Sequence, residues 1–162
     1  MKALPLVLLT CSLCGGCSQE TPPANAGPST SLAALRAMDA TAHIEEQDYH
    51  SALSDMEAAL IHAPQNTEYQ LLYCMLKERT GKPSNEAKAC YAEVAENLSS
   101  DPGLPCENNM NCVIAELMAE SDLAETHMQQ LLSLPAAEPE SEMRRYVLEG
   151  FDRTAYLRTI LP

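Results

Sequence analysis

Hydrophobic residues recur at intervals of three and four along most of the chain, which is typical of helices that bury one face. The clearest example runs from Asp48 to Pro64, where six apolar or small residues share one stripe. They are Tyr49, Ala52, Leu53, Met56, Ala59 and Leu60. Asp48 is suited to cap the start of this helix, and Pro64 ends it. Because no stretch alternates convincingly like a strand, the pattern predicts an all-α fold.

Seven further helices are expected, each bounded by a capping residue, a proline or a glycine. Their expected ranges are 32–46, 67–79, 84–98, a helix from Asn108 or Asn109, one from Ser121 and Asp122 to before Pro135, 140–149 and 153–161. The first has an imperfect apolar stripe of Leu32, Leu35, Met38 or Asp39, Ala42 and the Ile44 region. The helix over 140–149 is expected to turn Met143, Val147 and Leu148 inward.

The N-terminus has the form of a targeting segment. Lys2 precedes an apolar run from Ala3 to Leu9, which is too short to span a bilayer, and small residues and cysteines follow. This arrangement resembles a bacterial lipoprotein signal, in which a cysteine after small residues is acylated and becomes the new N-terminus. The resemblance implies a signal peptide over residues 1–16 and lipidation at Cys17. Since Cys14 stands where the family prefers an aliphatic residue, Cys11 or Cys14 is the alternative acceptor, and an ordinary secretory signal is the other interpretation.

The lipoprotein resemblance also implies a location. Ser18 follows Cys17 where lipoproteins kept in the inner membrane often have Asp, so the expected site is the outer membrane of a Gram-negative bacterium, facing the periplasm. The chain would be held there by acyl chains such as palmitate, with about 0.8 kcal/mol from each buried methylene. Residues 17–30 are expected to form the lipid anchor and a flexible tether with a reach of about 20 Å.

The chain is acidic, with a formal net charge of −13 at pH 7. Removing the predicted signal peptide, which holds one lysine and no acidic residue, makes the charge one unit more negative. Such a surface disfavours nucleic acid and anionic lipid as partners. A basic envelope protein or peptide would suit it, although solubility alone also explains the charge.

Four cysteines remain once the signal is removed and Cys17 is lipidated. An even number in an oxidising compartment favours two disulfides over a metal site. Cys74 and Cys90 lie eight residues either side of Lys82, in a predicted turn, so antiparallel helices would place them at the same level. Cys106 and Cys112 would close a small ring. A bridge from Cys74 to Cys112 is the competing pairing.

Three units share a small residue followed four positions later by a larger apolar one. The leading alanines, Ala52, Ala87 and Ala124, are 35 and 37 residues apart, close to the period of about 34 residues of the tetratricopeptide repeat (TPR). The stretch from Asp48 to Pro64 resembles the second helix of such a repeat. The resemblance implies about three stacked helical hairpins over residues 31–135, with the C-terminal helices of 136–162 packed on them as a cap. The repeat-packing residues would be Ala52, Met56, Ala59, Ala87, Tyr91, Ala124 and Met128.

Repeats of this family bind proteins, so the resemblance implies a groove lined by first helices, with Gln70 and Lys77 on it. The four histidines occur singly and no catalytic motif is present. We therefore expect no enzyme activity, cofactor or metal. The expected function is an adaptor or assembly factor for a secretion system, a pilus or a cell-wall enzyme complex. The alternative is an immunity or exclusion lipoprotein that neutralises an incoming toxin.

Overall fold

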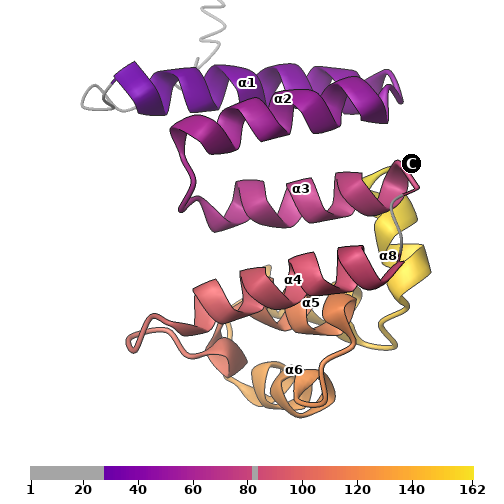
Figure 1. Ribbon diagram of the computed structural model, residues 1–162. Helices are drawn as coiled ribbons and strands as arrows, with labels where there is room; N and C mark the ends of the chain where they lie inside the picture. Colours follow the sequence, from indigo (N-terminus) through magenta and orange to yellow (C-terminus); the bar gives the residue numbers. More distant parts are fainter. Residues whose placement is uncertain (1–27, 82–83) are drawn as a thin grey trace, which may run out of the picture.

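The computed structural model describes residues 28–81 and 84–162, and every regular element in these ranges is helical (Figure 1). The all-α prediction is therefore confirmed. The elements are α1 (Pro28–Glu45), α2 (Tyr49–His62), α3 (Thr67–Arg79), α4 (Ser84–Ser99), the short 3₁₀ helix η1 (Cys106–Asn108), α5 (Met110–Ala119), α6 (Ala124–Ser133), α7 (Glu140–Leu148) and α8 (Arg153–Ile160). The predicted signal peptide and Cys17 lie outside the described residues.

Side-chain caps explain where several helices begin. At the starts of α2, α3, α5 and α8 a side-chain oxygen accepts a hydrogen bond from a backbone N–H two or three residues further along. The capping residues are Asp48, Asn66, Asn109 and Asp152. Each satisfies a donor that has no partner within the helix. Helix α6 has no such cap and begins at Ala124, later than the predicted start at Ser121 and Asp122.

The helices pack largely in chain order. Each of α1 to α5 contacts the helix that follows it, α6 also contacts η1, and α7 contacts α6. Figure 1 shows α1 and α2 together at one end, then α3, then α4 and α5 together, and α6 at the other end, with α8 beside the end of α3. That last contact is made in part by Arg79, whose Nε donates to the carbonyl of Leu161 at 3.2 Å. Among the described helices, none is both long and apolar enough to cross a bilayer.

Small residues bring neighbouring helices close together. The buried core contains Ala40, Ala52, Ala59 and Ala87 with no exposed surface, beside large side chains such as Tyr91. All seven residues assigned above to repeat packing are buried. A methyl group at a helix contact lets two backbones approach, and the larger residues then fill the space on either side.

Two predictions of inward-facing residues are wrong. In α1 the buried residues are Ala33 and Ala40. Of the predicted stripe, Ile44 is partly buried against the core, whereas Leu32, Leu35 and Met38 are 47%, 55% and 67% exposed. Helix α1 packs closely on α2, and a close approach of two helices favours a face of small residues. In α7, Leu148 is buried and Val147 partly buried as predicted, but Met143 is 54% exposed.

Two disulfides fix neighbouring elements. One joins Cys74 of α3 to Cys90 of α4, with a Cα–Cα distance of 5.7 Å, and the other joins Cys106 of η1 to Cys112 of α5, at 5.2 Å. The two predicted pairings are confirmed, and the competing bridge from Cys74 to Cys112 does not form. Each disulfide closes a local loop, because the paired residues are 16 and 6 positions apart.

A network centred on Glu78 ties α8 to the stack. The Arg153 guanidinium lies 2.7 and 2.8 Å from the two carboxylate oxygens of Glu78, and its Nε donates to the carbonyl of Met118 at 2.9 Å. The Tyr91 hydroxyl donates to the same carboxylate at 3.0 Å. Residues of α3, α4, α5 and α8 therefore meet at one mostly buried point.

Candidate functional site

A shallow groove crosses the middle of the stack, where α3 lies between α2 and α4. It encloses about 210 Å³. Its lining residues are Leu60, Pro64, Gln70, Tyr73, Cys74, Cys90, Glu93 and Val94. Most of this lining is apolar, and it includes the disulfide that joins α3 to α4. The groove therefore offers a mainly apolar surface whose two sides are held by a covalent bond.

The polar side chains in the groove are held in place. The Gln70 amide donates to the carbonyl of Pro64 at 2.6 Å and accepts from Asn97 at 3.1 Å. The Lys77 ammonium lies 5.4 Å from the centre of the Tyr73 ring, a distance suited to a cation–π contact. Gln70, which was expected on the binding face, lines the groove, and Lys77 lies beside one of its lining residues.

The edges of the groove carry negative charge. Glu93 of α4 lines it and is exposed, and Glu57 of α2 is exposed and close to Tyr73. Burial raises the pKa of the Tyr73 hydroxyl, and the neighbouring Glu57 carboxylate raises it further, so this phenol stays neutral at physiological pH. Carboxylates from both flanking helices make the groove suited to a segment that combines apolar and basic side chains.

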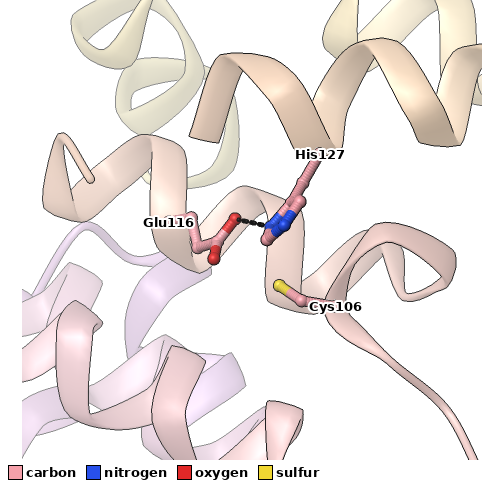
Figure 2. A group of neighbouring side chains, drawn as sticks. All are labelled: Cys106, Glu116 and His127. Carbon is pink, nitrogen blue, oxygen red and sulfur yellow. Dashed lines mark hydrogen bonds and ion pairs between the residues drawn. The ribbon is translucent and has the colours of Figure 1, made fainter. Parts of the chain in front are cut away.

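A second cluster lies where η1, α5 and α6 meet. Figure 2 shows that Cys106, Glu116 and His127 point toward one another. The Glu116 carboxylate lies 2.8 Å from Nδ1 of His127, and the three potential ligand atoms are all within 4.8 Å of one another. Glu116 is only 8% exposed, which is unusual for a charged residue. The Cys106 sulfur is bonded to Cys112, and a disulfide sulfur is a poor metal ligand because binding requires the thiolate.

This cluster was not predicted from the sequence, although the spacing of its residues indicates it. Glu116 and His127 lie at equal distances from the turn at Ser121 and Asp122. The same spacing about a turn predicted the pairing of Cys74 with Cys90. Cys112 and Glu116 are four residues apart on one helix and so share a face. Neither the equal spacing across the turn nor the shared helix face identifies a metal ligand without the other, so no histidine was assigned to a metal site.

The other histidines do not join this cluster. His43 of α1 lies 2.9 Å from Asp55 of α2, and Arg36 reaches the same carboxylate at 3.3 Å. These contacts clamp the first two helices together. His50 and His62 are exposed at the surface of α2.

No protein-family model matches this chain, and comparisons with curated proteins and with solved structures also found no match. The function of the chain is therefore inferred from its own residues: the groove over α3, the cluster of Cys106, Glu116 and His127, and the N-terminal sequence.

Proposed function

We propose that this protein is an outer-membrane lipoprotein, facing the periplasm, that binds a basic and partly apolar segment of another envelope protein. In this role it is an adaptor or assembly factor for a secretion system, a pilus or a cell-wall enzyme complex. The observation that carries the proposal is the groove over α3, with its apolar lining, the exposed Glu93 of α4 in that lining and the exposed Glu57 of α2 beside Tyr73.

The helix order supports a TPR-like arrangement within this proposal. Helices α1 and α2, α3 and α4, and α5 and α6 would be three hairpins, with α7 and α8 as the cap. The alanines that mark the repeat, Ala52, Ala87 and Ala124, lie in the second helix of each pair, and all are buried. Stacked hairpins of this kind share one continuous core, since a single hairpin cannot bury its own apolar face.

The chemistry of the groove fits an extended or helical peptide better than a small polar substrate. Its apolar lining would remove apolar side chains of the partner from water, at about 25 cal/mol for each Å² buried. Glu57 and Glu93 would pair with lysine or arginine ends, while the apolar stems of those residues lie on Tyr73 and Val94. The Cys74–Cys90 disulfide fixes α3 against α4, so the groove loses little conformational entropy when a partner binds.

Membrane attachment is tested with Cys17→Ser. We expect this variant to be recovered in the soluble periplasmic fraction, whereas the unchanged chain should sediment with outer membranes and carry acyl chains detectable by mass spectrometry. Retention of Cys17→Ser in the membrane without acylation would contradict the proposed anchor.

Partner binding is tested by crosslinking the anchored protein in its own envelope, purifying it and identifying the attached proteins by mass spectrometry. Glu93→Lys reverses an exposed charge in the groove, and Glu149→Lys reverses one at the separate surface between α7 and α8. We expect Glu93→Lys to lose a resident envelope partner that Glu149→Lys retains. Equal recovery with both variants would show that the groove over α3 is not the binding surface.

The immunity function is a second candidate because the net charge of −13 suits a basic toxin. The same experiment separates the two functions. An adaptor should recover a resident protein in the absence of any toxin. An immunity protein should recover none, and should bind tightly only when a candidate toxin is added.

A further inference from the structure

We propose that the disulfide between Cys106 and Cys112 occupies a latent zinc site. When a dithiol reduces this bond, the two cysteines bind one Zn²⁺ together with Glu116 and His127. The oxidised protein then holds a disulfide at this position and the reduced protein holds zinc. This inference is independent of the function proposed for the groove.

Three of the four donor atoms already lie near the spacing that zinc requires, and the fourth, the Cys112 sulfur, is bonded to one of them. Tetrahedral zinc binds sulfur at about 2.3 Å, and nitrogen or carboxylate oxygen at about 2.0 to 2.2 Å, so neighbouring ligand atoms lie about 3.3 to 3.8 Å apart. In the structure the Cys106 sulfur, a Glu116 oxygen and a His127 nitrogen are all within 4.8 Å of one another. The Cys112 sulfur is bonded to that of Cys106. Reduction would let the two sulfurs separate, so that both thiolates could contact one zinc ion beside Glu116 and His127.

The scaffold supplies the four ligands from three packed elements. Cys112 and Glu116 share one face of α5, His127 comes from α6, and Cys106 comes from η1. Helix α6 contacts both α5 and η1, so the ligands are held by the fold rather than by a long loop. Four protein ligands in a buried position are typical of a structural zinc site, since a catalytic site keeps one position open.

The chemistry balances as a dithiol exchange followed by metal binding. The dithiol gives two electrons and two protons to the Cys106–Cys112 bond, producing two thiols, and itself becomes a disulfide. Zinc binding then displaces both thiol protons, and the imidazole binds in its neutral form. The bound dication replaces the contact between Glu116 and His127 as the partner of the buried carboxylate.

The other disulfide provides a matched control. The described residues that line the groove around Cys74 and Cys90 include no histidine, although Glu93 is among them. A reduced Cys74 and Cys90 pair therefore has at most a carboxylate as a third ligand. Comparing Cys74→Ser/Cys90→Ser with Cys106→Ser/Cys112→Ser separates a built site from two arbitrary thiols.

The test measures zinc bound by the mature chain, residues 17–162, carrying Cys17→Ser. Bound zinc is compared before and after reduction with a dithiol that is then removed. Bound metal is measured by atomic absorption, and affinity by competition with a chromogenic zinc chelator. We expect one zinc per reduced chain, retained in Cys74→Ser/Cys90→Ser and lost in Cys106→Ser/Cys112→Ser. His127→Gln and Glu116→Gln should each weaken binding by about 100-fold or more, because loss of a ligand should exceed the 10- to 100-fold effect of losing its hydrogen-bond partner.

Three results would overturn the proposal. They are no zinc on the reduced chain while its circular dichroism stays helical, equal affinity in the two double-serine variants, and unchanged affinity in His127→Gln. If the variants of Cys106, Cys112, Glu116 or His127 do not fold, cobalt binding to a chain that keeps these four residues tests the site instead. We expect the reduced Cys74→Ser/Cys90→Ser chain to show the intense near-ultraviolet absorption of cobalt bound to thiolates, and its absence would refute the site.

Discussion

Replacing Arg153 with Met removes the group that joins the last helix to the stack. The variant loses the two ion-pair contacts to Glu78, at 2.7 and 2.8 Å, and the hydrogen bond to the Met118 carbonyl at 2.9 Å. Glu78 keeps the Tyr91 hydroxyl as a partner. Breaking a buried ion pair by removing one partner costs about 3 to 5 kcal/mol. Because the Glu78 side chain is 17% exposed and can gain some water, we expect the free energy of unfolding to fall by about 2 to 3 kcal/mol.

The assay is urea unfolding at neutral pH, followed by far-ultraviolet circular dichroism under oxidising conditions. Arg145→Met is the control, since Arg145 and Glu138 form an ion pair at 3.3 Å in which both side chains are more than half exposed. Its effect should be below about 0.5 kcal/mol. Adding Glu78→Met to Arg153→Met should recover part of the loss, because the second change removes the unpaired carboxylate. An Arg153→Met variant as stable as Arg145→Met, or no recovery in the double variant, would refute the reasoning.

Three further predictions concern the first helices and the first disulfide. Ala52→Leu should lower the free energy of unfolding by about 1 to 3 kcal/mol through overpacking, since Ala52 is fully buried, whereas Ala42→Leu at an exposed position should have little effect; equal stabilities in chemical denaturation would contradict this. Replacing both Cys74 and Cys90 with Ala should cost about 3 kcal/mol for a loop of 16 residues, and the difference from the parent should shrink when both are measured under reducing conditions. Hydrogen bonds to its carboxylate lower the pKa of Asp48 in the folded state. The stabilising effect of Asp48 is therefore present above about pH 4 and is lost as the pH falls through the folded pKa. Asp48→Asn should flatten this acid dependence of the melting temperature, and an unchanged pH profile would exclude a stabilising role of the Asp48 carboxylate.

Local signals predicted most of the secondary structure. The helix predicted over 67–79 has those bounds, and the predicted cap Asp48 accepts a backbone hydrogen bond. Caps and prolines act within one helical turn, so a short window of sequence contains the physical cause. The pairing of Cys74 with Cys90 was also predictable, because a single turn relates the two residues.

Side-chain orientation was harder to predict where apolar residues occur on more than one face. In α1 the larger residues Leu35 and Met38 suggested the core face, yet the helix buries Ala33 and Ala40. Hydrophobicity favours the larger residues, whereas the close approach of α1 to α2 favours the alanines. Which effect prevails depends on the distance between the two helices, and the side chains of both helices set that distance.

The contacts that hold the C-terminal helices could not be predicted from local sequence patterns, because they join residues far apart in the chain. Arg153 and Glu78 are 75 residues apart, and several other basic and acidic residues could have paired as well by charge alone. What selects this pair is burial: Arg153 meets Glu78 beside the fully buried Tyr91, and Leu161 is also fully buried. Glu116 and His127 show the intermediate case, since they are 11 residues apart and related by one turn, so a search for polar pairs across turns would have found them. The distance along the chain between two partners, and the number of turns that separate them, therefore determine how much of a site can be inferred before its structure is known.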